Sequence, residues 1–114
     1  LIGSIFSDGS SGGTSGLSGT YKEAFGSSIE FKDNSLFFDG CECEIVKIEG
    51  EERNIWRVGD CKSTFRTCNS SNYFQGEYID KFWNDNFNTY CVRFAKTISD
   101  LKPGGRGVTA YCDR

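Results

Sequence analysis

Six cysteines in a chain of 114 residues constrain the fold more than any other feature. They are Cys41, Cys43, Cys61, Cys68, Cys91 and Cys112. Cys41 and Cys43 are two residues apart, so in an extended strand their side chains point to the same side. A bridge between such neighbours strains disulfide geometry. We therefore expect each of the two to pair with one of the other four, while the sequence leaves the connectivity open.

A zinc site is the competing interpretation of these cysteines. The pairs Cys41-x-Cys43 and Cys61-x6-Cys68 would supply four thiolates. The spacing is not the usual C-x2-4-C pair repeated twice, the chain has no His, and two cysteines would be left over. We therefore predict disulfides, no metal ligands and no cofactor.

Disulfides indicate an oxidising compartment, and we predict a secreted or cell-surface protein. The chain begins with Leu, so we expect that either a leader has been removed or the sequence is partial. Asn69 lies in an N-x-[ST] tripeptide and is the expected glycosylation site.

The formal net charge of −3 argues against nucleic acid as a partner. No apolar run of about 18 residues is present, so we expect no membrane span.

From Thr20 onward, alternating apolar residues and frequent turn signals predict an all-β domain. We expect a small, disulfide-stapled sandwich or barrel-like domain over residues 20–114, preceded by an extended N-terminal arm over residues 1–19. The expected elements are a hairpin over 28–38, a second hairpin over 41–59 with a bulge near Ile45-Val46, a weak strand over 73–79, a central strand over 87–95, a helical turn over 99–102 and a last strand over 108–112.

The sequence carries no catalytic signature, and we predict no catalytic residue and no enzyme. A chain without His lacks the commonest general base. The alternation of Glu42 and Glu44 predicts that both side chains lie on the solvent-exposed face of a sheet. We expect them to lie opposite Arg53 and Arg57 in the second hairpin.

Oxygen donors cluster near one expected turn and allow two interpretations. The cluster consists of Asp80, Asn84, Asp85, Asn86 and Asn88. Such side chains bind calcium, but they are also ordinary turn residues, and the EF-hand spacing is absent. Trp83 lies among them between Phe82 and Phe87, so we expect it to be a core anchor; stacking on a sugar is the alternative.

The N-terminal arm joins an apolar tip to a tether rich in Gly and Ser. The tip consists of Leu1, Ile2, Ile5 and Phe6, and the tether spans residues 7–19. Disorder, folding back onto its own domain, and pairing with a neighbouring molecule are the three alternatives. The tether is longer than self-docking requires, which favours a neighbouring molecule.

The first function hypothesis is therefore a secreted structural protein. It would form a homo-oligomer or polymer, as a filament or surface layer, by inserting its N-terminal strand into the next subunit. The alternative is an extracellular carbohydrate- or protein-binding module, with calcium as a possible helper. It would use exposed aromatic side chains such as Tyr73, Tyr78 and Trp83. A small secreted enzyme or inhibitor is the third hypothesis.

Overall fold

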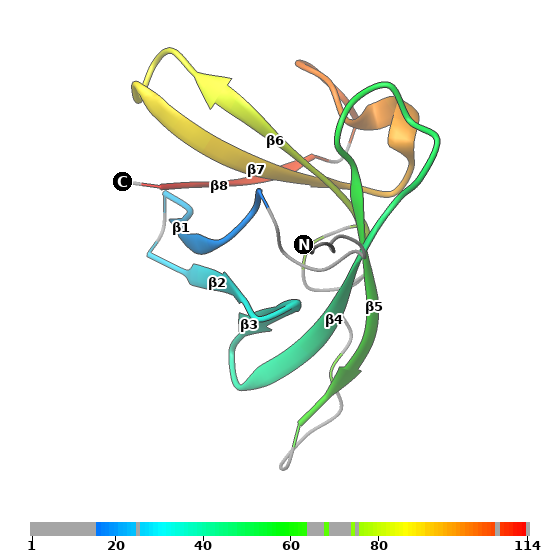
Figure 1. The fold of residues 1–114 in the computed structure, drawn as a ribbon. Helices are drawn as coiled ribbons and strands as arrows, with labels where there is room; N and C mark the ends of the chain where they lie inside the picture. Colours follow the sequence, from blue (N-terminus) through cyan, green and yellow to red (C-terminus); the bar gives the residue numbers. More distant parts are fainter. Residues whose placement is uncertain are drawn as a thin grey trace, which may run out of the picture.

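The chain folds as a closed antiparallel barrel, seen in a computed structural model that describes residues 16–24, 26–63, 68, 74, 76–106 and 108–113 (Figure 1). The strands follow one another around the barrel in chain order. They are β1 (Gly19–Lys22), β2 (Ser28–Lys32), β3 (Ser35–Phe38), β4 (Cys41–Lys47), β5 (Trp56–Lys62), β6 (Tyr78–Asn84), β7 (Thr89–Ala95) and β8 (Thr109–Cys112). The all-β prediction is confirmed, and of its two forms the barrel is the correct one.

The first predicted hairpin is confirmed as β2–β3. Ile29 and Phe31 are buried and alternate with exposed neighbours. The turn between the strands places Asp33 at φ 52° and Asn34 at φ 70°. Asp and Asn tolerate this left-handed region, and two such residues match the twist of a two-residue hairpin.

The second hairpin, β4–β5, has the expected irregularity but a different pairing. Its register shifts between Cys43 and Ile45, close to the predicted bulge. The strand β5 continues to Lys62, which therefore lies opposite Glu42. Arg57 lies opposite Val46. The prediction that Glu42 and Glu44 face Arg53 and Arg57 is wrong, because Arg53 precedes β5 and the pairing of Glu42 with Lys62 leaves Arg57 opposite Val46.

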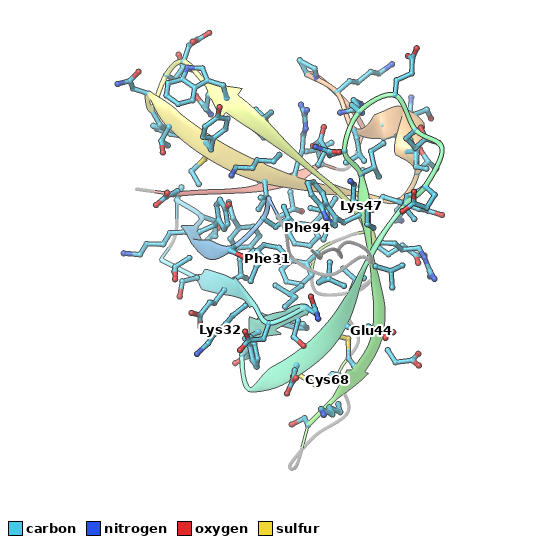
Figure 2. All side chains as sticks on the ribbon, viewed as in Figure 1. Phe31, Lys32, Glu44, Lys47, Cys68 and Phe94 are labelled. Atoms are coloured by element: carbon cyan, nitrogen blue, oxygen red, sulfur yellow. A yellow bond between two sulfur atoms is a disulfide. The ribbon has the colours of Figure 1, made fainter. Side chains whose placement is uncertain are left out.

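The barrel interior holds the main core (Figure 2). Phe31 and Phe94 enter it from opposite parts of the barrel. Phe74 is fully buried and stacks on Phe94 with ring centroids 4.1 Å apart. Leu17 is also fully buried, and its carbonyl accepts a hydrogen bond of 2.9 Å from the Tyr21 hydroxyl. The packed body of the barrel thus includes Leu17, a residue that the sequence analysis placed in the arm.

A second, smaller core lies outside the main one. Ile55, Ala95 and Leu101 form it, with Ile48 and Ile98 packed against them. The β4–β5 connection and the 3₁₀ helix η2 (Ile98–Asp100) lie close together beside the base of β6 and β7 (Figure 1). The helix confirms the expected helical turn before Pro103, one residue early.

The six cysteines form three disulfides, as predicted. The bridges are Cys41–Cys68, Cys43–Cys61 and Cys91–Cys112. Cys41 and Cys43 pair with different partners, as expected. The closed loops span 27, 18 and 21 residues, and each bridge of this size contributes about 3 kcal/mol in the chain-entropy account.

Candidate functional site

The described large apolar side chains that are exposed gather on one hairpin, β6–β7. Trp83 is 48% exposed, Phe87 47% and Tyr90 49%. The prediction of Trp83 as a core anchor is wrong. Trp83 and Tyr90 share the sheet face of the buried Ile79 and Phe94, but they lie toward the turn, where the hairpin runs away from β1–β3 (Figure 1). The side chains of β6 and β7 still alternate between the two faces of the hairpin here, but within the described residues no opposing strands cover the inner face near the turn.

Trp83 and Tyr90 form an aromatic platform. They are direct cross-strand partners, and their ring centroids lie 5.0 Å apart in an edge-to-face arrangement. The Lys81 Nζ lies 4.8 Å from the centroid of the Tyr90 ring and donates a hydrogen bond of 3.0 Å to the Gly16 carbonyl. The ammonium group is therefore held beside the platform by two contacts.

The turn beside the platform is shaped by asparagines. The Asn84 side-chain oxygen accepts hydrogen bonds from the backbone N–H groups of Asn86, at 2.9 Å, and Phe87, at 3.2 Å. Asn88 adopts φ 53°, which Asn tolerates better than most residues. Two members of the proposed calcium cluster thus have the turn role that was the alternative interpretation.

Asp80, a third member of that cluster, serves a different purpose. Its carboxylate is 1% exposed and accepts two hydrogen bonds from Arg93, at 2.8 and 2.7 Å. Arg53 donates to the same carboxylate and to the Leu101 carbonyl. Two guanidinium groups therefore satisfy Asp80, and this side chain is not available to complete a calcium site with the asparagines of the turn.

A hollow of about 500 Å³ lies next to the aromatic platform; we call it the platform hollow. Its volume falls within the usual range of small-molecule sites, about 300–1,000 Å³. Trp56 lines it, and the buried Nε1 of Trp56 has no hydrogen-bond acceptor in the described part of the chain. The residues around this hollow are Gly16, Glu52, Arg53, Asn54, Trp56, Lys81 and Tyr90.

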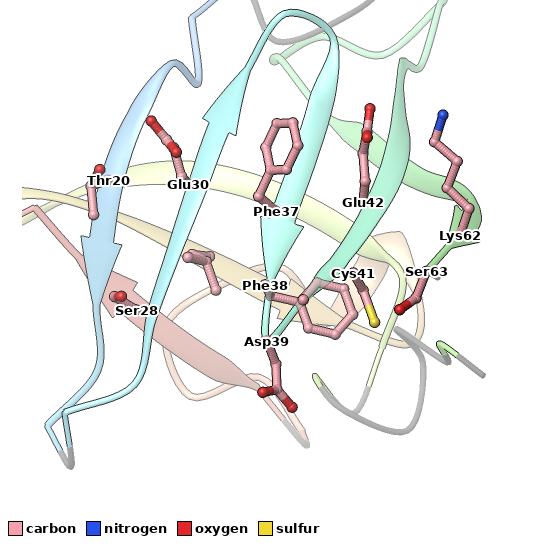
Figure 3. A pocket seen from close by; sticks show the side chains of 12 residues that line it. Thr20, Ser28, Glu30, Phe37, Phe38, Asp39, Cys41, Glu42, Lys62 and Ser63 are labelled. Atoms are coloured by element: carbon pink, nitrogen blue, oxygen red, sulfur yellow. The ribbon is translucent and has the colours of Figure 1, made fainter. Parts of the chain in front are cut away.

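A larger hollow of about 670 Å³ lies over β1–β5, and we call it the sheet hollow (Figure 3). Five of its residues are successive cross-strand partners, so that one row crosses five strands. In that row the Phe37 ring stands between two carboxylates. The row runs Thr20, Glu30, Phe37, Glu42 and Lys62. Glu42 also accepts a hydrogen bond of 3.1 Å from the Ser35 hydroxyl.

Several residues singled out in the sequence lie outside the described part of the chain. They are Leu1, Ile2, Ile5, Phe6, Asn69 and Tyr73. Tyr78 is described and is half-buried against the second core.

Sequence reasoning missed Lys81 and Tyr90 as candidate site residues. The sequence places Tyr90 on the same face of the expected central strand as Val92 and Phe94, and alternation alone does not reveal where the opposing layer ends. A signal was nevertheless present, because Lys81 interrupts the inward-facing series of β6 between Ile79 and Trp83.

Comparison with protein-family models, with curated protein sequences and with solved structures finds no match for this chain. Within the described residues, no three His, Cys, Asp or Glu side chains are grouped so that they would hold a metal ion. The described part of the chain also contains no helix with the length and apolar character needed to span a membrane.

Proposed function

We propose that this protein is an extracellular carbohydrate-binding module whose binding surface is the aromatic platform of β6–β7. The observation that carries the proposal is the exposure of Trp83, Phe87 and Tyr90 on one hairpin. Contiguous exposed aromatic surface costs solubility and marks interaction sites. Three disulfides support the extracellular part of the proposal, because such bridges persist in oxidising compartments.

The surroundings of the platform favour a sugar over a protein partner. A pyranose ring has an apolar C–H face that stacks on aromatic rings and a rim of hydroxyl groups that need hydrogen bonds. Lys81, Asn54 and Glu52 offer such polar groups in the adjacent hollow. A stable protein interface buries about 800 Å² on each partner around an apolar centre. Three aromatic residues on a two-stranded hairpin offer a narrow surface with a polar surround.

A glycan array probed with the full chain tests this proposal. We expect retention of at least one class of oligosaccharide, and loss of that retention in Trp83→Ala and Tyr90→Ala. Each aromatic contact contributes about 0.5–1.5 kcal/mol, or roughly 2–10-fold in affinity. Phe37→Ala, in the sheet hollow, is the matched control and should bind normally. Retention that survives the double substitution of Trp83 and Tyr90 contradicts the proposal, as does an array without any binding.

Self-assembly through the N-terminal arm is the second proposed function. The observation that favours it is the seam between β1 and β8, which pair at one position, Lys22 with Cys112. Because the pairing is antiparallel, Gly19–Tyr21 run past the C-terminal end of β8, and this edge of β1 is where an added strand would find backbone partners. The arm reaches the barrel next to this seam, because β1 begins at Gly19.

The test of self-assembly compares the full chain with a chain that lacks residues 1–15. The deletion ends there because Leu17 belongs to the core. We expect the full chain to form concentration-dependent oligomers in analytical ultracentrifugation and the shortened chain to remain a folded monomer. Oligomers that persist without residues 1–15 contradict this second proposal.

A further inference from the structure

We propose that the sugar taken by the platform is anionic, and that Lys81 recognises its acidic group in the platform hollow. This inference rests on the proposed carbohydrate-binding function and names the class of its ligand. The acidic group is a carboxylate or a sulfate, since both present oxygen acceptors with a negative charge to an ammonium group.

The position of Lys81 is the first argument. It is the cross-strand partner of Val92, one step inward along the same sheet face from Trp83 and Tyr90. Its ammonium is fixed by the Gly16 carbonyl at 3.0 Å and by the Tyr90 ring at 4.8 Å. An ammonium has three N–H donors, and these two contacts occupy one of them with a hydrogen bond. A fixed cation at the base of an aromatic ring loses little side-chain entropy when a ligand binds.

The charge of the surroundings is the second argument. Asp80 faces two guanidinium groups, those of Arg53 and Arg93, so this cluster keeps a net positive charge. Arg53 and Lys81 both line the platform hollow, against a single carboxylate, Glu52. The hollow is therefore electropositive on a chain whose formal net charge is −3.

The sheet hollow provides the contrast. Three carboxylates line it, those of Glu30, Asp39 and Glu42, against one cation, Lys62. The two hollows have opposite charge, so an anionic ligand is favoured at the platform and disfavoured over β1–β5.

A matched pair of ligands tests the inference with the full chain. The probes are an oligogalacturonide and its methyl ester, which share a sugar backbone and differ in charge. A heparin-derived oligosaccharide, compared with its desulfated form, which keeps the uronate carboxylates, forms a second arm that tests sulfate recognition separately. We expect at least one probe to bind about tenfold or more tightly than its less charged counterpart, by isothermal titration calorimetry. The preference should shrink as salt rises.

Variants separate this inference from the proposed function. Lys81→Gln should bring the acidic and neutral probes to the same affinity, and Lys81→Arg should keep much of the preference. Lys62→Gln, in the sheet hollow, is the control for general charge and should leave the preference unchanged. Equal binding of acidic and neutral probes, with binding still lost in Trp83→Ala, overturns the inference and leaves the carbohydrate-binding function standing. Equal losses in Lys81→Gln and Lys62→Gln also overturn it. Absence of binding to every probe and to the array overturns both.

Discussion

Arg93 donates two parallel hydrogen bonds to the Asp80 carboxylate across the β6–β7 hairpin, of 2.8 Å from Nε and 2.7 Å from Nη2. The two residues are direct cross-strand partners, and both side chains are nearly buried, at 8% and 1% exposure. The Arg93 guanidinium also lies over the Phe82 ring, 4.2 Å from its centroid. This pair joins the base of the hairpin to the 48–55 connection, because Arg53 donates to the same carboxylate. The hairpin that carries the aromatic platform is thus held at its inner end by these buried hydrogen bonds.

Asp80→Asn should destabilise the barrel strongly. Removal of one partner leaves the Arg93 charge buried without its counter-ion, and such changes cost about 3–5 kcal/mol. Glu77→Gln is the matched control, because the Arg57–Glu77 pair, at 3.3 Å, is about 40% exposed on both sides. Pairs of that kind contribute at most about 1 kcal/mol. Urea denaturation of the two variants measures the contrast. Similar midpoints would show that the buried pair is no more important than the exposed one.

Phe74→Ala should be among the most damaging single changes in the interior. The ring is fully buried, stacks on Phe94, and meets Phe38 and Tyr111 edge to face. Loss of a buried Phe costs about 3–5 kcal/mol. Phe87→Ala, at a ring that is 47% exposed, should cost about 0.5 kcal/mol or less. Thermal melting followed by circular dichroism compares them. Phe74→Leu keeps the variant measurable if the alanine protein does not fold, and it should lie between the other two.

The local elements were predictable from the sequence, because they depend on neighbours in the chain. The turn at Asp33-Asn34 and the alternation of Ile29 and Phe31 are properties of a few consecutive residues. The pairing of β4 with β5 was harder. The expected ion pairs failed because the connection between the strands is longer than the expected turn: β5 begins at Trp56, after Arg53, and extends to Lys62, which lies opposite Glu42. The shift between Cys43 and Ile45 moves the register by one further residue.

The candidate site was harder to predict, because it depends on contacts between residues that are far apart in the sequence. Trp83 was assigned to the core because two Phe residues flank it, yet exposure was decided by where the opposite strands end. The sequence allows Asp80 as a calcium ligand beside Asn84 and Asp85, but Arg53, 27 residues earlier, donates a hydrogen bond to its carboxylate. Gly76 interrupts the weak strand that the sequence predicts over 73–79. It precedes β6, and a Cβ at this position would overlap the backbone of Ala95.

Peptide mapping should recover the three disulfides, provided that the digestion cuts between Cys41 and Cys43. Trypsin leaves both in one peptide, so it cannot separate the bridge to Cys68 from the bridge to Cys61. Digestion with trypsin together with a glutamate-specific protease separates them, because the second enzyme cuts after Glu42 and trypsin cuts between Cys61 and Cys68, after Lys62 and Arg66. We expect Cys41 linked to Cys68 and Cys43 linked to Cys61 in non-reducing mass spectrometry. The exchanged pairing would contradict the barrel, because Cys43 and Cys61 are direct cross-strand partners in it.

Tyr21 should make the barrel less stable in alkali. Burial raises the pKa of the Tyr21 phenol above its ordinary value of 10.0, and the nearby Asp113 carboxylate raises it further. The folded protein therefore holds this proton more tightly than the unfolded chain does. The resulting stability is complete below about pH 10 and is lost as the pH rises from there through the folded pKa.

Tyr21→Phe isolates this effect. At neutral pH it removes the hydrogen bond to the Leu17 carbonyl and should cost about 1 kcal/mol. Between about pH 9 and pH 11 its stability should fall less steeply than that of the parent protein. Tyr90→Phe is the control for loss of a phenol hydroxyl, since that ring is half exposed and does not contact the Leu17 carbonyl. Urea midpoints across this range measure both slopes. Parallel slopes for the parent and Tyr21→Phe would mean that the Tyr21 proton is not linked to folding.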